Sequence, residues 1–381
     1  MTLHAHHWFV LSGGLSPYTL ELWEAVASRS SHTVTLAHVP REDQSDFVHE
    51  GDFIRSKVVE IVPVQSLKTV IHLGARCSKA PHATIVCMGH SPIYNVLISA
   101  FARAASPKNR LILYASDTNG VVLAERAGAT SSGSVALQTK RAVLGRIFPA
   151  SLDLGFSNRL AHRMLGIGKS IGIPLLPIEF PASMDAEIPE PLGTLVRELP
   201  RPRLLTVSRL VKSKNLVGLV EAFTAATKEG MPGSLTIVGE GPERSQIDPL
   251  LCRLRERTVL AGPVPFNVSR RLFGAFDGMV MLSTFEPWGI VIVEGLGWGV
   301  PVLSSLHCGA GVSLALETGD AVKLCGTTQG DMKSSLIEFV GHLERHTAAA
   351  KTAAPMIRRK FGMTEVADAL IRLGESDGGT C

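Results

Sequence analysis

The sequence predicts an α/β protein of two similar domains, each a parallel sheet wrapped by helices. The 381 residues are too many for one small domain and suit two of about 150 to 200 residues. Short apolar, β-branched segments alternate with helical segments, which is typical of strand–helix–strand units. A proline-rich, acidic stretch at 180–203 interrupts this alternation, which then starts again.

In the first half, the predicted strands share a short run of apolar and β-branched residues. They lie at 7–14, 32–39, 82–89, 110–117 and 151–158. The segment SPYTLELWEAVASRS reads as a helix, because Ser16 can cap its start and Pro17 suits its first turn. Another helix is expected near 95–105.

In the second half, strands and helices alternate more regularly. The predicted strands are 203–210, 234–241, 258–262, 278–284 and 300–305, and the predicted helices are 215–230, 243–257, 267–276, 290–298 and 364–376. We expect an N-terminal domain at 1–180, a linker at 181–203, a C-terminal domain at 204–360, and a closing helix and tail at 361–381. The two sheets are expected to face each other across a cleft that binds a small molecule, with the last helix packing back on the first domain.

The charge is distributed unevenly along the chain. Residues 100–170 contain ten Lys or Arg against three acids, although the formal net charge is only +4. This segment is either a solvated face or a surface that meets anionic lipid, to which each basic group contributes about 1 kcal/mol. The overall charge is too small to indicate nucleic acid.

Cysteine usage and hydropathy bear on localisation. The six cysteines form no CxxC pair, which is typical of reduced thiols in an intracellular protein. The N-terminus lacks the features of a signal peptide, and no apolar stretch reaches the roughly 18 residues of a membrane-spanning helix. We therefore expect a cytoplasmic protein, peripheral at the inner face of the membrane.

The segment STFEPWGIVIVEGLGWGVPVLSS at 283–305 places two carboxylates, Glu286 and Glu294, in an otherwise apolar run. A strand ends here and a helix begins, so the amides of Gly289, Ile290 and Val291 lack intrahelical partners and favour an anion such as a phosphate. Carboxylates beside that anion would accept hydrogen bonds from sugar hydroxyls. The alternative is a helix cap and a core glutamate whose hydrogen bonds are satisfied.

Two further loops could hold a phosphate. Arg209 and Lys214 in VSRLVKSKN follow a predicted strand, and at the same sheet edge they would clamp a diphosphate rather than act as surface charge. Gly13 and Gly14 follow the first strand but lack the GxGxxG spacing, so they are either a phosphate approach or a tight turn.

The polar candidates for a reaction centre are His90 and Asp117. Each follows an apolar strand of the first half, where a lone polar residue can equally be a loop cap. There is no Asp-x-Asp triad, P-loop, GxSxG or HExxH motif, so hydrolase and kinase chemistry is not indicated.

Across 200–310 the order of the motifs VSRLVKSKN, LTIVGEGPE, LAGPV and FEPWGIVIVEGLGWGVPVLSS resembles the family-4 retaining glycosyltransferases. That family has two facing Rossmann-like domains, the GT-B fold. The resemblance implies a hexosyltransferase-type enzyme that moves a sugar from a nucleotide-diphosphate donor to an acceptor without a metal or cofactor. The acceptor is expected to be a lipid-linked or surface-polysaccharide glycan.

The resemblance also implies roles for particular residues. Arg209 and Lys214 would hold the donor diphosphate, which Gly13 and Gly14 would approach from the other domain. In the loop and helix start, Glu286 and the amides of Gly289 to Val291 would address the transferred sugar. Glu294 would accept the ribose hydroxyls.

The chain departs from the family pattern at two places. Many relatives carry a His where Ser116 and Asp117 stand here, so Asp117, or else His90, is expected at the reaction centre. The family's Gly-Gly and Glu appear as HCGAGVSLAL, in which Cys308 to Gly311 can form a turn but the acid is missing. Two other functions stay open: a GT-B-type nucleotide-sugar 2-epimerase, and a non-catalytic nucleotide-sugar-binding subunit.

Overall fold

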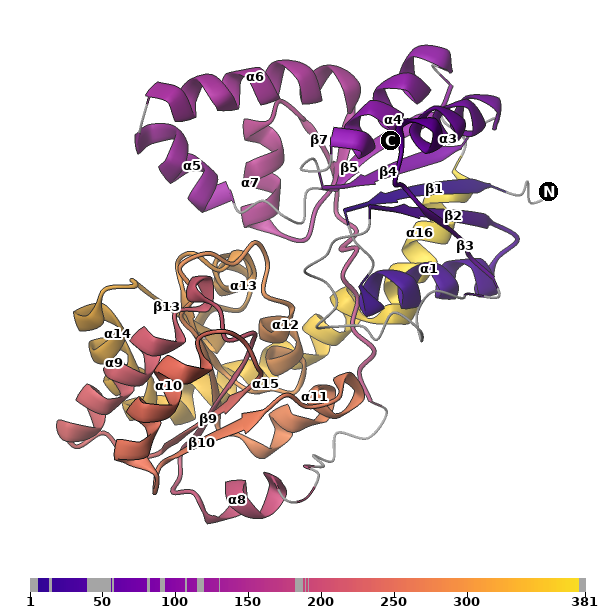
Figure 1. Ribbon diagram of the computed structural model, residues 1–381. Coiled ribbons are helices and arrows are strands. Elements are labelled where there is room, and N and C mark those ends of the chain that lie inside the picture. The colour runs from indigo at the N-terminus through magenta and orange to yellow at the C-terminus, as the bar shows by residue number, and fades with distance from the viewer. Residues whose placement is uncertain are drawn as a thin grey trace. The chain divides into compact units, whose positions relative to one another are not determined.

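The computed structural model describes residues 6–13, 16–39, 56, 58–80, 83–89, 93–106, 108–114, 120–129, 131–181, 188, 190 and 192–376. The chain divides into two compact units (Figure 1). The first comprises Met1–Ile178 with Lys360–Cys381, and the second comprises Glu179–Arg359. Within the described residues, no helix combines the length and the hydropathy that crossing a membrane requires.

The first unit contains a seven-stranded sheet with the order β3-β2-β1-β4-β5-β6-β7, and all of its pairs are parallel. Its strands are β1 (His7–Ser12), β2 (Thr33–His38), β3 (Glu60–Pro63), β4 (Thr84–Met88), β5 (Arg110–Tyr114), β6 (Ala150–Leu152) and β7 (Lys169–Ile171). Strands β3 and β7 were not predicted from the sequence. They are the two edge strands, short and largely unburied, so neither has the apolar run that marks a strand in sequence.

Helices cover both faces of this sheet. They are α1 (Pro17–Arg29), α3 (Leu67–Lys79), α4 (Ile93–Ala105), α5 (Gly120–Ala129), α6 (Ser131–Ile147), α7 (Phe156–Met164) and α16 (Met363–Glu375). Ser16 caps α1 as predicted, because its Oγ accepts a 3.2 Å hydrogen bond from the Thr19 amide. The closing helix α16 packs on α1, and Figure 1 shows these two on the opposite side of the sheet from α3 and α4.

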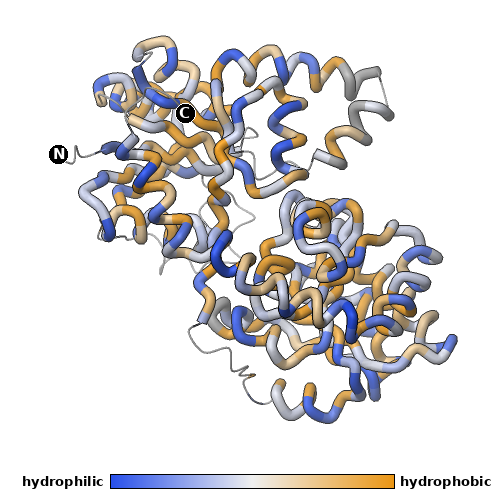
Figure 2. The backbone as a smooth tube through the Cα atoms, turned by 180° about the vertical axis from the view of Figure 1, so that it is seen from behind, coloured by the Kyte–Doolittle hydropathy of each residue, from blue (hydrophilic) through white to orange (hydrophobic). Residues whose placement is uncertain are grey.

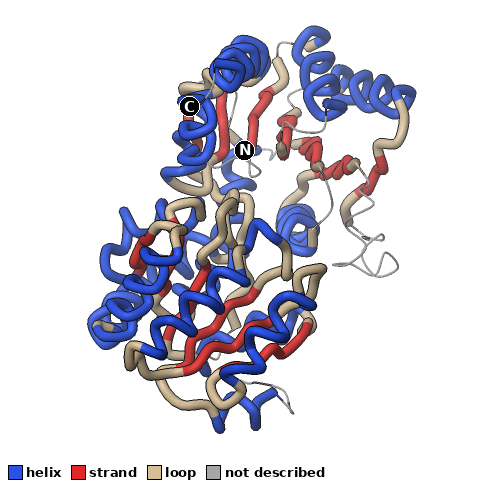
Figure 3. Tube along the Cα trace, turned by 60° about the vertical axis from the view of Figure 1, so that its left-hand side comes forward, coloured by secondary structure: helices blue, strands red, loops and turns tan. Residues whose placement is uncertain are grey.

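The second unit contains a six-stranded parallel sheet with the order β10-β9-β8-β11-β12-β13. Figure 3 draws the strands of the chain in red among its helices. Its strands are β8 (Arg203–Val207), β9 (Ser234–Val238), β10 (Thr258–Gly262), β11 (Gly278–Met281), β12 (Val302–Ser305) and β13 (Val322–Cys325). Its helices are α8 (Leu192–Glu198), α9 (Leu216–Lys228), α10 (Arg244–Leu251), α11 (Phe266–Leu272), α12 (Ile290–Gly297), α13 (Gly309–Thr318), α14 (Gln329–Gly341) and α15 (Leu343–Phe361).

The central strands of each unit form its core. Figure 2 shows hydrophobic stretches of the backbone, in orange, within both units. In the second unit, Leu235, Val280 and Leu303 from three different strands belong to one fully buried cluster. Two-sided burial is what the continuous apolar runs of the sequence predict for a parallel sheet covered by helices.

The proline-rich stretch that we expected to be a linker is part of the second unit in the structure. It contains α8, and the Arg203 guanidinium donates to the carbonyls of Arg197 at 2.6 Å and Leu199 at 3.2 Å. Asp277 accepts from the Arg203 amide at 2.7 Å and from Arg201. The described end of this stretch, residues 192–203, is therefore held beside the sheet by side-chain contacts that its composition does not reveal.

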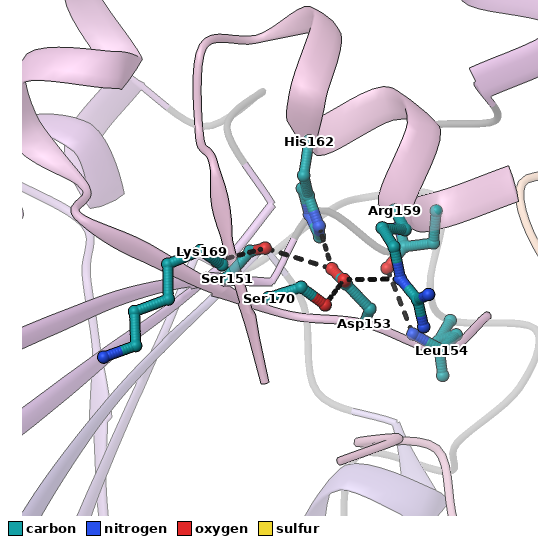
Figure 4. A network of polar contacts seen from close by, with 8 residues as sticks. Ser151, Asp153, Leu154, Arg159, His162, Lys169 and Ser170 are labelled. Carbon is teal, nitrogen blue, oxygen red and sulfur yellow. Dashed lines mark hydrogen bonds and ion pairs between the residues drawn. The ribbon is translucent and has the colours of Figure 1, made fainter. Parts of the chain in front are cut away.

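A buried carboxylate joins β6, α7 and β7 in the first unit (Figure 4). Asp153 contacts His162 Nδ1 and accepts hydrogen bonds from Ser151 Oγ at 3.0 Å and from Ser170 Oγ. Its side chain is fully buried, and Arg159 Nε lies 3.5 Å away. Burial raises the pKa of Asp153, but the hydrogen bond and charge of His162, with the two serine hydroxyls, outweigh burial and hold that pKa below its usual value.

We expect Asp153→Asn to destabilise the first unit by about 2 kcal/mol at pH 7, because the partners of the carboxylate lose a charged acceptor. The folded pKa of Asp153 lies below the unfolded value of about 3.9, so its contribution is present above about pH 4. That contribution disappears as the pH falls through the folded pKa. Thermal unfolding at pH 7, 5 and 3 should show the gap between wild type and variant closing at acid pH.

A matched control is Asp368→Asn in the same unit, because Asp368 forms an exposed ion pair with Arg29. This variant should unfold within about 0.5 kcal/mol of wild type. Hydrogen exchange of peptides spanning 150–171 should accelerate only in Asp153→Asn. Equal exchange in both variants would contradict the proposal that buried Asp153 holds β6, α7 and β7 together.

Candidate functional site

The candidate site lies in the second unit, at the carboxyl edge of its sheet. Strands β8 and β11 are neighbours, and the chain leaves them toward opposite ends of the sheet, since β9 lies beyond β8 and β12 beyond β11. Such a switch point is where open α/β sheets bind ligands. The two loops that leave it, 208–215 and 282–289, carry four residues that the sequence identified: Arg209, Lys214, Glu286 and Gly289.

These two loops are hydrogen-bonded to each other. The amide of Thr284 donates to the Ser213 carbonyl at 2.9 Å, and Asn215 Nδ2 donates to the Leu282 carbonyl at 3.1 Å. Asn215 has a φ of 55°, a left-handed conformation that ends the short helix η2 (Lys212–Lys214) and starts α9. The fixed turn delivers Lys214 toward the second loop.

Lys214 and Glu286 form an ion pair at the centre of the site, between Lys214 Nζ and Glu286 Oε2. Their side chains are only 15% and 12% exposed, so solvent screens the pair less than it screens a surface salt bridge. The residues are far apart in sequence, and the neighbouring positions of β8 and β11 bring them together. The cation predicted to bind phosphate is thus paired with the acid predicted to face the sugar.

A third loop, after β12, supports Glu286 from the other side. The Glu286 amide donates to the His307 carbonyl and the Gly309 amide donates to the Glu286 carbonyl, both at 3.1 Å. The amide of Ala310 donates to the Trp288 carbonyl at 2.7 Å. A Cβ on Gly309 would lie 2.1 Å from the Pro287 carbonyl oxygen, so the close approach needs glycine. The sequence predicted only a turn here, and the glycines of Gly309-Ala310-Gly311 were its one signal of this contact.

The thiol of Cys308, in this loop, is unreactive. Cys308 is fully buried, and burial, with the negative charge of Glu286 adding, raises its pKa to about 11. A thiol with that pKa stays protonated at neutral pH and is a poor nucleophile. Cys308 therefore serves the packing of the loop.

Helix α12 starts at the same edge. Its N-cap, Gly289, has a φ of 91°, and a Cβ there would lie 3.1 Å from Glu286 Cγ and 3.2 Å from Met281 Sδ. Only glycine fits this turn, which leaves the first amides of the helix, at Ile290 and Val291, facing the carboxyl edge of the sheet. The arrangement suits an anion placed next to Lys214.

Glu294 lies in the same helix and is 3% exposed. The sequence left two interpretations of Glu294, an acceptor of hydroxyls beside the anion and a core glutamate whose hydrogen bonds are satisfied. A buried glutamate this close to a helix start is uncommon in a core. Its role as a ribose acceptor stays a prediction.

The glycine loop after β9 packs against the loop that carries Arg209. The Leu210 amide donates to the Glu240 carbonyl at 2.9 Å, and the Glu243 amide donates to the Leu210 carbonyl at 2.9 Å. Gly239 has a φ of 143°, and a Cβ there would lie 1.9 Å from the Ser208 carbonyl oxygen. Arg209 itself is exposed at this edge. The glycines in VGEGPE thus hold the Arg209 loop in place.

The candidates from the first unit are less fully placed. Gly13 directly follows β1 at the carboxyl edge of its sheet. Gly14, His90 and Asp117 lie outside the described residues, so their predicted roles stay predictions. Among the residues that are described, no three His, Cys, Asp or Glu side chains gather as a metal ion would need.

Comparisons with known proteins agree with this architecture. Residues 201–346, less than half of the chain, match the family model described as glycosyl transferases group 1. Alpha-D-kanosaminyltransferase of Streptomyces kanamyceticus is 29% identical over 96 residues, and this match spans only 25% of each chain.

Two solved structures are similar over nearly the full chain. The Anabaena Alr3699/HepE structure in complex with UDP-glucose has a TM-score of 0.68 at 14% identity, covering 98% of this chain and 100% of that one. Sucrose-phosphate synthase from Thermosynechococcus elongatus has a TM-score of 0.68 at 16% identity, covering 97% and 98%. The fold is therefore that of GT-B glycosyltransferases, and residues 201–346 are a glycosyltransferase domain.

Proposed function

We propose that this chain, a GT-B fold with a glycosyl transferases group 1 domain, transfers a sugar from a nucleotide-diphosphate donor to an acceptor with retention of configuration. The observation that carries the proposal is the Lys214–Glu286 pair at the β8/β11 switch point, beside the start of α12. Cation, carboxylate and helix amides lie together there, and a diphosphate carrying a sugar needs all three.

In this proposal Lys214 breaks its ion pair with Glu286 and binds the donor diphosphate instead. Lys214, Arg209 and the amides at Ile290 and Val291 stabilise the charge that builds on the departing diphosphate. Glu286, released from its ion pair, accepts hydrogen bonds from the sugar hydroxyls. The binding of the donor therefore assembles the site, because it exchanges one partner of Lys214 for another.

Retention follows from attack on the face that the diphosphate leaves. The bond from the anomeric carbon to the phosphate oxygen breaks, and a bond from that carbon to the acceptor oxygen forms. The acceptor proton passes to a phosphate oxygen, so no strong protein base is needed. Asp117 and His90 are the candidates for positioning the acceptor and sugar in this step.

We propose that transfer needs no metal, since Lys214, Arg209 and the α12 amides supply the positive charge that a metal would otherwise provide. We expect the protein to bind its donor and to transfer the sugar in the presence of a chelator. Membership of family 4 in particular, and a hexose as the transferred sugar, belong to the same proposal.

The proposed acceptor is a lipid-linked or surface-polysaccharide glycan, met by the protein at the inner face of the membrane. The support is the excess of seven basic groups over acids between residues 100 and 170. Anionic lipid attracts such a segment. A 2-epimerase or a non-catalytic subunit would use the same donor site and is separated from this function by the assay below.

The proposal predicts that nucleotide sugars stabilise the protein against heat. Because a ligand at 100 times its Kd adds about 2.7 kcal/mol, the expected rise in Tm is several degrees. UDP-, GDP- and dTDP-sugars should be screened with EDTA present. UDP-glucose is the first donor to test, because the HepE structure contains it.

The nucleotide sugar that raises the Tm is then incubated with the protein without an acceptor, and the products are separated. Slow hydrolysis of the sugar from the nucleotide is the expected result for a transferase. An epimerised donor would point to the 2-epimerase, and binding without any turnover to the non-catalytic subunit. If no nucleotide or nucleotide sugar raises the Tm, the proposed function fails.

A further inference from the structure

Three helices of the first unit that contact one another contain no acidic residue. They are α3 (LKTVIHLGARCSK), α4 (IYNVLISAFARAA) and α6 (SSGSVALQTKRAVLGRI), and α4 contacts both of the others. The helices α1 and α16 on the opposite side of the sheet contain Glu21, Glu24, Glu365, Asp368 and Glu375. The two faces of one sheet therefore differ in charge.

The same acid-free face exposes large apolar side chains. On α4, Ile93, Leu97 and Phe101 follow one another at intervals of four residues and are 61%, 43% and 47% exposed. On α3, Leu67 and Ile71 have the same spacing and are 61% and 56% exposed. Residues four apart lie on one side of a helix, so each helix presents an apolar row to solvent.

The two rows lie side by side. A Cβ on Gly74 of α3 would be 2.6 Å from Phe101 Cδ1, so the Phe101 ring rests on α3 at this glycine. Both helices leave the carboxyl ends of their preceding strands, β3 and β4, in a parallel sheet. The rows therefore run in the same direction and form one apolar strip, which starts at the carboxyl edge of the sheet.

Exposed basic residues flank the strip. They are Lys68 and Lys79 on α3, Arg103 on α4, and Lys140, Arg141 and Arg146 on α6. The nearby acid Glu60 is engaged by Arg76 at 2.6 Å. Arg141 and Arg146 also line an open hollow of about 410 Å³ beside Gly166. The face therefore combines exposed apolar area with positive charge, and the helices α3, α4 and α6 contribute no carboxylate to it.

We propose that the α3/α4 face, with α6 at its margin, docks on an anionic lipid bilayer. Apolar side chains that enter the acyl boundary and basic groups that meet headgroup phosphates are the two contributions that hold an amphipathic surface on such a membrane. A second copy of this chain would bring the same positive charge to the contact and be repelled. The lipid-linked acceptor rests on the proposed function, and docking here would bring its headgroup to the carboxyl edge of the sheet.

The test is cosedimentation of the full chain with vesicles of phosphatidylcholine, with and without phosphatidylglycerol, at low and high salt. Wild type should bind the anionic vesicles and lose binding as salt rises. Ile71→Ser/Ile93→Ser should lower the partition coefficient by about tenfold or more. The matched control is Leu195→Ser/Leu316→Ser, two comparably exposed leucines of the second unit, which should bind as wild type does.

A charge variant, Lys68→Glu/Arg103→Glu, should lose the preference for anionic over neutral vesicles. The proposal is overturned if wild type does not bind anionic vesicles at low salt, or if the Ile71/Ile93 variant binds as tightly as the control. It is also overturned if light scattering shows that wild type is a dimer in solution and that Ile71→Ser/Ile93→Ser, unlike the control, is a monomer.

Donor-induced thermal stabilisation is measured on every variant, because the donor site lies in the other unit. Loss of vesicle binding with an unchanged donor-induced rise in Tm confirms that the surface acts separately from the donor site. Vesicle binding in a protein that no nucleotide sugar stabilises would leave the docking surface standing and remove the proposed function.

Discussion

Replacing Lys214 with alanine is expected to lower kcat/KM for the nucleotide-sugar donor by about a thousandfold. Lys214 Nζ is the cation that the structure places beside Glu286 at the switch point. One hydrogen bond to a charged group contributes about 1.5 to 3 kcal/mol, which accounts for a loss of about 10 to 150-fold in donor binding. The rest is expected in kcat, because the leaving diphosphate loses the charge that stabilises it.

Initial rates over a range of donor concentrations separate the two contributions, and calorimetric titration with the free nucleoside diphosphate measures the first alone. The control is Lys212→Ala, an exposed lysine on the same short helix, which should have wild-type kinetics. Glu286→Gln should show the converse, with diphosphate binding kept or tightened and kcat reduced, because Lys214 loses the carboxylate that competes for it. Wild-type KM and kcat in Lys214→Ala would contradict the proposed diphosphate site.

Sequence alone predicted the fold because the central strands are buried on both sides. Each of β8, β9 and β11 is a run of apolar or β-branched residues followed by a glycine or polar loop, and parallel strands place such loops at one edge. Lys214 and Glu286 could be assigned to that edge without any knowledge of strand order. Charged residues in apolar surroundings are conspicuous in a sequence, so Glu286 and Glu294 could be named as candidates, and their roles stay predictions.

The contacts between loops could not be predicted, because they depend on the order of strands in the sheet. That Lys214 reaches Glu286 requires β8 beside β11, and that Gly309 supports Glu286 requires β12 beside β11. The edge strand β13 was missed, and so was helix α13, which starts at Gly309 where the sequence indicated only a turn. Glycine has a low helix propensity, so the sequence gives little signal for α13. Packing against the loop that carries Glu286 stabilises this helix.

The sequence also left open whether Glu294 faces the site or lies in the core. In a surface helix the polar positions mark the solvent side, but α12 is buried along nearly its whole length and has no polar face to orient it. The pattern could therefore identify Glu294 as exceptional without showing where its side chain lies. This makes the consequences of changing Glu294 the most informative about the donor site.

Glu294→Ala is expected to abolish nearly all transfer while the protein stays folded. If Glu294 accepts the ribose hydroxyls, its removal leaves those donors without their acceptor, and a charged hydrogen bond is lost for each hydroxyl. Glu294→Gln keeps the volume and one acceptor oxygen, so it should retain more activity than alanine but lose about a hundredfold in kcat/KM. Circular dichroism and Tm establish that both variants fold, and Glu344→Gln, an exposed glutamate of α15, is the control.

The ribose contact itself can be separated from a general loss of activity by comparing nucleotides. Wild type should bind the preferred nucleoside diphosphate at least about tenfold more tightly than its 2′-deoxy and 3′-deoxy analogues, because each missing hydroxyl leaves the carboxylate without a donor. In Glu294→Gln that preference should fall to a small factor, so that the two changes are strongly non-additive. Full additivity would mean that Glu294 stabilises α12 and does not touch the ribose, and the donor would then be held by Lys214 and the helix amides alone.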